Sequence, residues 1–481
     1  MTSELNLSAH NLKVFFTNFS DLDGRLDPLY YFSVNNLHLA NNTAHPVQKL
    51  SDVILMTRGR FGHRPRNDPR FYDGEYPFIQ TGDVVRASEG NGKITYSQTL
   101  NELGLETSRL FNKSTVVITI AANIGDTAIL DYPACFPDSL IGMQPKNDSI
   151  TLEYINLYFK FIKNYLNDLA PQSAQKNINY QQLAPVPIVI PPLAIQKKAV
   201  ETYEAALSEK AQKEQQAQTL LSGVDTYLLN ELGIPTLGQE DNSISQRIFI
   251  RNYSDISGSR ADPYFHKKIF IDFFDVLRNS KYPVYTLKKL SEKITSGITP
   301  LSGGDSYTDI ESGILFIRSG NIDINGLLDF SEMIYIRPEI HNGIMKSSKV
   351  QKNDLMIAIV GATIGQVGIY LDEREANINQ AIALVRLNED FNPQFVKELI
   401  KSSIGQMCLN RLKRPVARAN INLEEISSMP IIVPPSEIQD KIVYHIQSVR
   451  NRAAKLREEA TQEFEQAKRE VEAMILGRNE V

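Results

Sequence analysis

Five arginines stand close together in the segment MTRGRFGHRPRNDPR, residues 56–70, which contains one acid, Asp68. The arginines are Arg58, Arg60, Arg64, Arg66 and Arg70. Glycine and proline in the segment favour a projecting loop over a helix face. Because guanidinium groups clamp phosphates and pair bidentately with guanine, we predict that this arginine loop contacts DNA. The alternative is a solvated loop whose arginines pair with acids elsewhere in the chain.

A second group of cations lies in LNRLKRPVARANIN, residues 409–422, which contains no acid. Its members are Arg411, Lys413, Arg414 and Arg418. Cations without a local acid are available to neutralise phosphates, so we predict that this cation strip contacts a nucleic-acid backbone.

Three segments resemble catalytic or metal-binding motifs, but each lacks residues that the motif requires. GATIGQVG (361–368) has the spacing of a phosphate loop but lacks the Gly-Lys-Ser/Thr that ends one. LDPLY (26–30) and ADPYF (261–265) are similar to the Asp-Pro-Pro-Tyr motif of adenine methyltransferases, but both lack the second proline. The seven histidines do not show the HExxH spacing of a zinc site. We therefore predict no catalytic residue, no metal site and no bound cofactor.

The segments that carry these residues occur twice in the chain, in the same order. The matching pairs are VFFTNFSDLDGRLDP (14–28) with IFIRNYSDISGSRADP (248–263), PFIQTGD (77–83) with LFIRSGN (315–321), TVVITIAANIGDTAIL (115–130) with LMIAIVGATIGQVGIY (355–370), NIN (177–179) with NIN (420–422), and IPPLAIQ (190–196) with VPPSEIQ (433–439). An offset that drifts by a few residues indicates a diverged duplication with small insertions in loops.

The duplication gives the arginine loop a counterpart of different chemistry. The aligned segment is TSGITP, residues 295–300, in which Thr295, Ser296 and Thr299 supply hydroxyls in place of charge. Hydroxyls and backbone amides bind phosphates or base edges, so we predict that this loop also contacts DNA.

A further pair of candidate loops follows from the same alignment. Gln80 and Thr81 align with Arg318 and Ser319. Gln and Arg both make bidentate base contacts, and Ser or Thr bonds to a base or a phosphate. In the first copy, Lys176 is the one cation at the position of the cation strip, so that half relies less on it.

Each copy divides into a globular part and a long helix. Val/Ile-rich runs such as 116–120 and 355–360, separated by glycine turns, indicate an α/β or α+β domain. Residues 193–232 contain no proline, and apolar residues from Ile442 to Met474 follow steps of four and three. Glycine follows each helix, as expected at a helix end. The predicted parts are recognition domain 1 (1–190), spacer helix 1 (191–233), recognition domain 2 (234–433) and spacer helix 2 (434–481).

Helices of this length must pack outside their own domains. Forty residues of helix span about 60 Å, more than the width of a domain of about 190 residues. We expect the two helices to pair antiparallel as a coiled coil about a pseudo-twofold axis, with a recognition domain near each end. Two similar domains held at a fixed separation suit duplex DNA with two half-sites, and their different sequences predict different half-sites.

Composition limits the class of protein. The net charge of −5 argues against binding of nucleic acid. However, binding of a duplex depends on the local electrostatic potential of one surface and not on the net charge of the whole chain. Two cysteines, Cys135 and Cys408, are too few for a disulfide-rich secreted protein. The start of the sequence lacks the pattern of a secretory signal, and the apolar stretch 184–195 is too short to cross a membrane. We expect a soluble, cytoplasmic protein.

The duplicated order also resembles the specificity subunits of type I restriction-modification systems. PPLAIQ (191–196) and PPSEIQ (434–439) resemble their helix starts, and FIRSGNI (316–322), ATIGQVG (362–368) and ANINQAI (376–382) resemble their recognition domains. The resemblance covers nearly the whole chain. The first copy departs from it, because Ala-Cys-Phe-Pro at 134–137 replaces the Ala-Asn-Ile-Asn of the second copy.

The resemblance implies a non-catalytic subunit that binds an asymmetric, bipartite sequence of double-stranded DNA. It implies two methyltransferase subunits, which carry S-adenosylmethionine, and ATP-dependent restriction subunits as partners. Three other interpretations stay open: an enzyme with an unrecognised site, a protein-binding scaffold, and a specificity subunit of a complex that only methylates or serves another phage defence. The sequence does not give the recognised bases.

Overall fold

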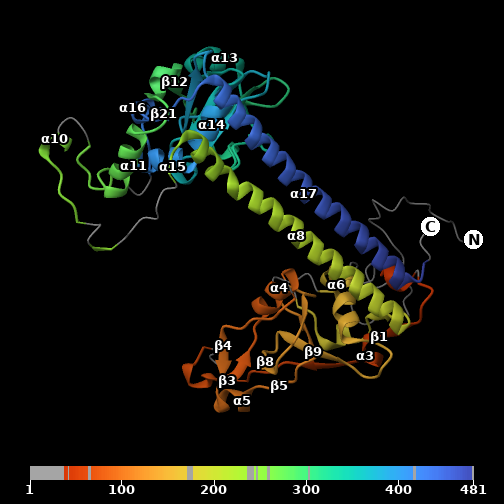
Figure 1. The fold of residues 1–481 in the computed structure, drawn as a ribbon. Helices are drawn as coiled ribbons and strands as arrows, with labels where there is room; N and C mark the ends of the chain where they lie inside the picture. The colour runs from red at the N-terminus through yellow and green to blue at the C-terminus, as the bar shows by residue number, and fades with distance from the viewer. Residues whose placement is uncertain are drawn as a thin grey trace, which may run out of the picture. The chain divides into compact units, whose positions relative to one another are not determined.

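The computed structural model describes residues 37–41, 43–62, 67–90, 92–170, 177–235, 243–244, 248–256, 260–301, 304–414 and 419–478. The chain forms two compact units, shown in Figure 1. Unit 1 comprises Met1–Lys213 with Glu458–Val481, and unit 2 comprises Glu214–Arg457. Each unit therefore contains one globular domain and a segment of each long helix.

Unit 1 is a mixed structure of short strands and helices. Its strands are β1 (Val47–Lys49), β2 (Ile54–Arg58), β3 (Tyr72–Phe78), β4 (Gln98–Leu100), β5 (Leu110–Phe111), β6 (Val116–Thr119), β7 (Thr127–Ile129), β8 (Ala134–Cys135), β9 (Leu140–Pro145) and β10 (Pro187–Val189). Its shorter helices are α2 (His38–Asn41), α3 (Leu50–Val53), η2 (Pro69–Phe71), α4 (Thr81–Glu89), α5 (Glu102–Thr107), α6 (Leu152–Leu169) and α7 (Tyr180–Leu183).

Two four-stranded sheets organise unit 1. One is antiparallel, in the order β2-β9-β6-β7, and the other has the order β4-β3-β8-β5 with a parallel β3–β8 pair. Strand β6 is buried along its whole length, because apolar residues cover both of its faces. Val116 and Ile118 pack toward α6, whereas Val117 packs toward α4 and the second sheet. A continuous apolar run is the pattern expected of such a two-sided strand.

Unit 2 contains the equivalent elements. Its strands are β11 (Val284–Thr286), β12 (Ser291–Ser296), β13 (Tyr307–Thr308), β14 (Ile314–Ile317), β15 (Ile334–Ile336), β16 (Lys349–Val350), β17 (Leu355–Ala358), β18 (Val367–Ile369), β19 (Ala376–Ile378), β20 (Ile382–Leu387) and β21 (Pro430–Ile432). Its shorter helices are α10 (Tyr253–Ile256), α11 (Lys268–Arg278), α12 (Leu287–Leu290), η3 (Ser319–Asn321), α13 (Pro338–Asn342), η4 (Lys346–Ser348), η5 (Gly361–Thr363), α14 (Pro393–Lys401), α15 (Ser403–Leu412) and α16 (Leu423–Ser427).

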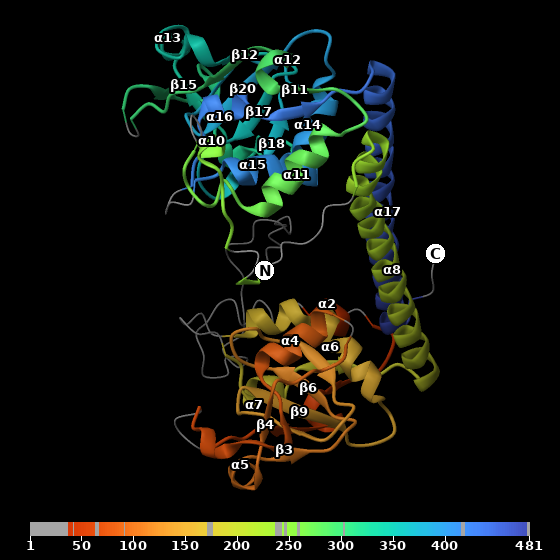
Figure 2. The ribbon, with the colours of Figure 1, turned by 60° about the vertical axis from the view of Figure 1, so that its left-hand side comes forward.

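The sheets of unit 2 repeat the topology of unit 1. The order β12-β20-β17-β18 corresponds to β2-β9-β6-β7, and β15-β14-β19-β16 corresponds to β4-β3-β8-β5, again with one parallel pair. Helices α14 and α15 pack on the first of these sheets, as Figure 2 shows. The last asparagine of each NIN motif has the same structural role in the two units, because Asn179 caps α7 and Asn422 caps α16, each in a capping box.

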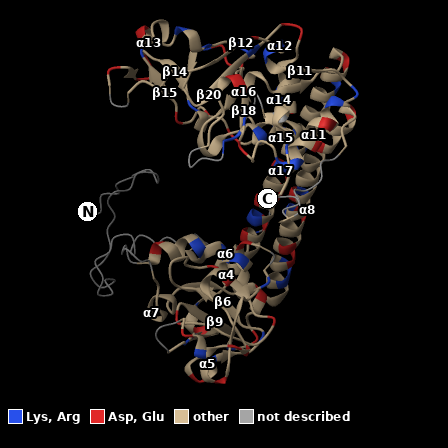
Figure 3. Cartoon of the chain, turned by 90° about the vertical axis from the view of Figure 1, so that its left-hand side faces the viewer, with Lys and Arg blue, Asp and Glu red and all other residues tan. Residues whose placement is uncertain are grey.

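The two expected long helices are α8 (Leu193–Leu232) and α17 (Ser436–Leu476). In each unit their segments lie side by side and run in opposite directions (Figure 1). In unit 1 the ring of Tyr203 packs edge-on against Phe464, with centroids 5.5 Å apart. In unit 2 the ring of Tyr227 stacks on His445 at 3.7 Å. Acidic and basic residues are spread along both helices in Figure 3.

The predicted apolar stripe of α17 forms the seam. Its members are all buried or half-buried: Ile442, Ile446, Val449, Ala453, Leu456, Ala460, Phe464, Ala467, Val471 and Met474. The glycines predicted to end the helices adopt left-handed conformations, with φ of +70° at Gly233 and +68° at Gly477. The pattern of two mixed α/β domains with two long antiparallel helices is confirmed. No helix among the described residues is both long enough and apolar enough to cross a membrane.

The glutamine that follows each double proline joins a long helix to its domain. Gln196 is fully buried, accepts the N–H of Thr151 at 3.0 Å, and donates to the carbonyls of Ser149 and Pro191 at 2.8 Å each. Because Thr151 is the N-cap of α6, the start of α8 is tied to the start of α6. The motif therefore fixes how the long helix leaves the domain.

Gln439 repeats this arrangement in unit 2. It is 3% exposed, accepts the N–H of Asn392, the N-cap of α14, at 3.3 Å, and donates to the carbonyl of Pro434 at 2.9 Å. The asparagine side chain also donates to Asp440 at 2.8 Å.

Candidate nucleic-acid interface

The arginine loop begins where β2 ends. Arg58 is the last residue of the strand, and Arg60 follows Gly59. A side chain at position 59 would lie 2.3 Å from the carbonyl oxygen of Pro137, so only glycine fits there. Both arginines are exposed: the Nε of Arg58 donates to the carbonyl of Asp138 at 2.6 Å, and Arg60 donates to the carbonyl of Glu106 at 3.4 Å. Among the residues that the structure describes, neither guanidinium group pairs with an acid.

Sequence reasoning missed a third arginine at this position, Arg109. An isolated bridge pairs Phe61 with Ser108, and the Ser108 hydroxyl donates to the Arg60 carbonyl at 2.7 Å. The exposed Arg109 then donates to the carbonyl of Arg58 at 3.2 Å. Nothing in the local sequence of Arg109 indicates this, because the bridge joins segments that are far apart in the chain.

The C-terminal end of the arginine loop contains an internal ion pair. Arg70 contacts Asp68 at 2.7 Å, and this hydrogen-bonded pair raises the pKa of Arg70. Asp68 also accepts the backbone N–H of Arg70, so the pair caps the short helix η2. The charge of Arg70 is therefore partly neutralised. The predicted contacts Arg64 and Arg66 lie outside the described residues.

The hydroxyl loop of unit 2 occupies the equivalent place. Thr295 and Ser296 end β12, and both are half-buried, whereas Thr299 is exposed. A side chain at Gly297 would lie 1.7 Å from the carbonyl oxygen of Ile378, the same close approach as at the glycine of unit 1. The hydroxyl of Thr299 accepts the backbone N–H of Gln380 at 3.5 Å.

Gln80 and Arg318 start the same backbone turn in the two units. Gln80 donates its N–H to Asp83 at 2.7 Å, and Arg318 donates its N–H to Asn321 at 3.0 Å. Gln80 is exposed, and Arg318 is half-buried with one guanidinium nitrogen 3.4 Å from the carbonyl of Glu332.

The structure brings the arginine loop and the Gln80 loop together. The hydroxyl of Thr81 hydrogen-bonds with Ser139 at 3.1 Å, next to the Asp138 that Arg58 contacts. Ser319 is the half-buried counterpart of Thr81 in unit 2. Both predicted loops of unit 1 thus lie along the segment that follows β8.

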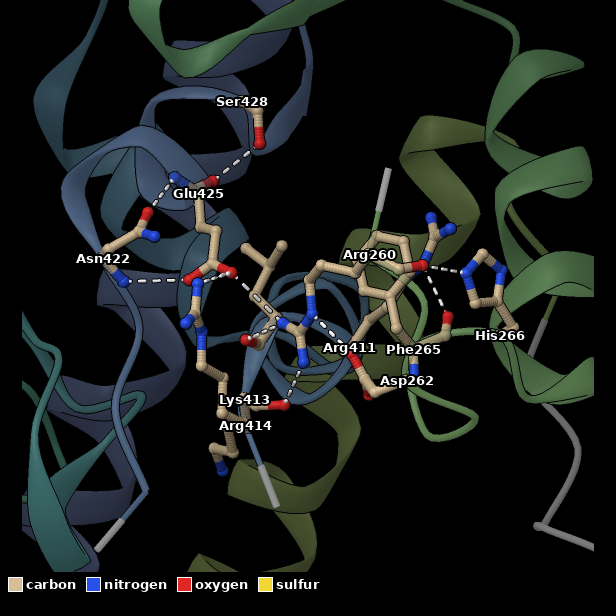
Figure 4. A network of polar contacts seen from close by, with 11 residues as sticks. Arg260, Asp262, Phe265, His266, Arg411, Lys413, Arg414, Asn422, Glu425 and Ser428 are labelled. Atoms are coloured by element: carbon tan, nitrogen blue, oxygen red, sulfur yellow. Dashed lines mark hydrogen bonds and ion pairs between the residues drawn. The ribbon is translucent and has the colours of Figure 1, made fainter. Parts of the chain in front are cut away.

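The cation strip has partners that its own sequence does not show (Figure 4). The guanidinium of Arg411 lies over the rings of Phe265 and Phe274, at 4.1 and 4.3 Å from their centroids. Burial lowers the pKa of Arg411. This side chain therefore packs the end of α15 against the segment 260–266 and α11, and its charge is partly enclosed.

Other members of the strip are also held within unit 2. Arg414 is exposed and pairs with Glu425 at 3.2 Å, although the strip itself contains no acid. Lys413 donates to the side chain of Asn410 at 2.7 Å, and burial lowers its pKa. Arg418 lies outside the described residues. An acid outside the strip, Glu425, thus neutralises part of the charge of Arg414.

Arg260, which directly precedes the ADPYF segment, contacts the end of α15 and pairs with Asp262 of that segment (Figure 4). Arg260 donates to the carbonyls of Leu412 at 2.6 Å and Lys413 at 3.2 Å, which are unpaired at the end of α15. It also pairs with Asp262 at 2.8 Å and Glu425 at 3.2 Å. The aspartate that resembles part of a methyltransferase motif therefore takes part in a structural network.

This architecture matches a known protein family. The family model of the type I restriction modification DNA specificity domain matches residues 47–219 and 308–466, which together make up more than half of the chain. The chain belongs to this family. The resemblance stated from the sequence is confirmed, and each match covers parts of one globular domain and its following helix.

Individual relatives are distant in sequence. The specificity subunit of the type I restriction enzyme EcoBI from Escherichia coli is 23% identical over 390 residues, which cover 78% of this chain and 73% of the relative. A chain from a structural study of complex assembly and conformational transition in a type I system matches with a TM-score of 0.60 and 13% identity, covering 91% of this chain and 98% of the other. The subunit from M. genitalium matches with a TM-score of 0.43 and 12% identity, over 92% and 98%.

Equivalent loops of the two units carry different kinds of side chain. Unit 1 offers exposed arginines and Gln80, and unit 2 offers hydroxyls and Arg318. Both sets stand at the same ends of the same strands, because β2 corresponds to β12 and β3 to β14. DNA sequence recognition is the role that membership of the family implies.

Proposed function

We propose that this chain is the non-catalytic specificity subunit of a type I restriction-modification complex and binds a bipartite, asymmetric DNA sequence. Each unit recognises one half-site. The observation that carries the proposal is the pairing of equivalent backbone positions with different side chains, Arg58 and Gln80 against Thr295 and Arg318. A shared scaffold presents both loop sets to a duplex in the same way, and different side chains select different bases.

The contacts favour DNA over a protein partner at these loops. Arg58, Arg60 and Arg109 bond to backbone carbonyls, which hold the guanidinium groups in place without cancelling their charge. Positive charge held in place beside an amide and hydroxyls is suited to a phosphate backbone and to base edges.

The repeat also implies the partners. Two methyltransferase subunits bind, one for each copy of the globular domain and its helix, and ATP-dependent restriction subunits join them. Native mass spectrometry of the co-expressed chain and methyltransferase tests this stoichiometry. We expect two methyltransferase subunits for one specificity chain at saturation. A stable one-to-one complex would contradict the symmetric arrangement.

Replacing residues 244–433 with the equivalent domain of a relative tests the division into half-sites. Methylome sequencing of the host should show one altered half-site and one unchanged half-site. The matched control replaces residues 47–190, which should alter the other half-site alone. Changes in both half-sites after a single replacement would show that the units do not recognise DNA independently.

A gel shift of the purified chain on random duplex DNA separates the remaining interpretations. We expect binding that weakens steeply with salt. A protein scaffold would show no such binding, and an enzyme would methylate or cleave DNA without added subunits. A complex that only methylates would protect the site without restricting unmodified DNA.

A further inference from the structure

An open hollow of about 500 Å³ lies in unit 1 beside the β3–β4 pair. Its apolar wall is formed by Phe61, Tyr72 and Phe78, whose ring centroids lie 5.1 to 6.1 Å apart. Gln80 and Gln98 line it as well. Aromatic walls with a few polar groups are typical of a site that takes a flat, partly apolar ligand.

A bulge in β3 opens this hollow. Tyr72 and Tyr76 both pair with Leu100, so the residues between them leave the regular ladder. Asp73 lies in the bulge with a φ of 61°, a left-handed conformation that aspartate tolerates better than most residues. Asp73 also lines the hollow, and its negative charge disfavours a phosphodiester there. The hollow therefore favours the edge of a base over the phosphate backbone.

Two glutamine amides are joined at the rim. The amide N–H of Gln80 donates to the side-chain oxygen of Gln98, and both side chains are exposed. Phe78, two residues before Gln80, lies directly opposite Gln98 in the β3–β4 ladder. The backbone therefore holds the two glutamines close together. An amide oxygen has two lone pairs, so Gln98 can accept a second hydrogen bond while its own N–H₂ donates.

This combination matches one base. Adenine presents an N6–H donor and an N7 acceptor in the major groove, and the amide of Asn or Gln pairs with both. The methyl group of the paired thymine needs an apolar surface, which the aromatic wall and Pro137 provide.

Unit 2 lacks this arrangement at the equivalent positions. Phe316 corresponds to Phe78, and the residue opposite it is Ile334 in place of Gln98. Gln80 is replaced by Arg318, which suits guanine. The amide pair therefore distinguishes one unit from the other.

We propose that Gln98, oriented by Gln80, recognises an adenine·thymine pair in the half-site of unit 1. This inference rests on the proposed function and names the base-reading group within it. Gln98 is the specificity-determining residue and Gln80 is a positioning residue.

The test measures base preference with the chain in complex with its methyltransferase, using duplexes that vary each position of the half-site. Gln98→Ala should reduce the preference for adenine at one position by about tenfold or more. Gln98→Glu should shift that position toward cytosine, because a carboxylate accepts from the cytosine amino group. Gln80→Ala should weaken the same preference less, since Gln98 remains.

Two controls accompany these variants. Gln48→Ala removes an exposed glutamine from β1 of the same unit and should leave all preferences unchanged. The half-site of unit 2 should stay unchanged in every variant. Uniformly weaker binding without a change in preference would overturn the inference, and so would an unchanged adenine preference in both Gln98 variants. A wild-type complex without any sequence preference would instead overturn the proposed function itself.

Discussion

Strands β8 and β19 lie at the same place in their sheets, yet their interiors are built from different chemistry. Cys135 of β8 is opposite Phe78, and Asn377 of β19 is opposite Phe316. Cys135 is fully buried among aromatic and aliphatic side chains that include Phe61. At this position the two units therefore have equivalent backbone strands but different buried side chains.

The core around Asn377 is polar, and both polar atoms of the Asn377 amide have partners. Its amide donates to the carbonyl of Met345 at 2.8 Å and to the hydroxyl of Ser348 at 3.2 Å, and its oxygen hydrogen-bonds with His341. A buried network of this kind is stable only when every member has a partner. The layer beneath the loops has therefore diverged together with the loops, whereas the glutamines at the starts of α8 and α17 have not.

The largest expected difference between the units concerns Glu398. It lies six residues after the N-cap of α14, where unit 1 has the buried Leu157, and it contacts Arg450 through two hydrogen bonds of 2.6 Å. Glu398→Leu leaves Arg450 and the buried Lys397 without this anion, so we expect a loss of about 3–5 kcal/mol in unfolding free energy. Urea denaturation and calorimetry of the variant and the wild type measure this loss in unfolding free energy.

The matched control for Glu398 is the double variant Glu398→Leu/Arg450→Leu, which should recover most of the loss because an apolar pair can replace a buried ion pair. Burial would raise the pKa of Glu398, but the ion pair with Arg450 outweighs burial and lowers it. The stabilisation is therefore fully present above the unfolded value of 4.5 and is lost as the pH falls through the lower folded pKa. A single variant as stable as the wild type would contradict this role.

The second prediction compares the two strand positions directly. Asn377→Ala leaves His341, Ser348 and a buried carbonyl without their partner, so we expect a loss of about 3 kcal/mol. Cys135→Ala removes apolar contacts and one hydrogen bond with Ser108, and should cost about 1 kcal/mol. Thermal unfolding of both variants gives the difference. Equal losses would mean that the polar network contributes nothing beyond packing.

The third prediction tests the element that both units share. Gln196→Leu should cost about 2 kcal/mol, because it leaves one buried N–H and two carbonyls without partners. Gln439→Leu should cost less, since its bond to Asn392 is longer, at 3.3 Å. If these glutamines fix how each helix leaves its domain, both variants should also tolerate a DNA gap changed by one base pair. Methylome sequencing would detect such extra sites, and unaltered gap selectivity would show a role in stability alone.

The smallest effects are expected from single exposed arginines. Arg58→Ala should lower the salt dependence of DNA binding by about one unit if Arg58 contacts a phosphate. Arg70→Ala should have a smaller effect, because Asp68 already neutralises this guanidinium in part. Arg278→Ala, at an exposed arginine paired with Asp275 on α11, is the control. An identical salt slope after removal of all five arginines of the loop would contradict the assignment.

The sequence predicted those features that repeat or that act locally. The order of the matched segments predicted two equal domains, and the steps of four and three from Ile442 to Met474 predicted the seam of α17. The end glycines were predicted for the same reason, because a helix end depends on the conformation of one residue.

Site residues that depend on distant partners were harder to predict. The sequence around Arg411 shows cations without an acid, but Phe265 and Phe274 enclose this side chain from more than 130 residues away. Gln98 has no local signal at all, because its relation to Gln80 exists only in the register of β3 and β4. Pairing across a sheet is a property of the fold, and a single sequence does not encode it in any local pattern.

The core of unit 1 has a consequence for the order of synthesis. Val471, Ile475 and Leu476 of α17 are buried in the same cluster as α6 and the start of α8. The carbonyl of Leu476 also accepts the N–H of Ala44 at 2.8 Å. These residues leave the ribosome after every residue of unit 2, on the order of 10–50 s later than Tyr203 at 5–20 residues per second. Unit 1 must wait for that interval with part of its apolar surface uncovered, which exposes it to chaperones and to misassembly. The unit that is made first is completed last.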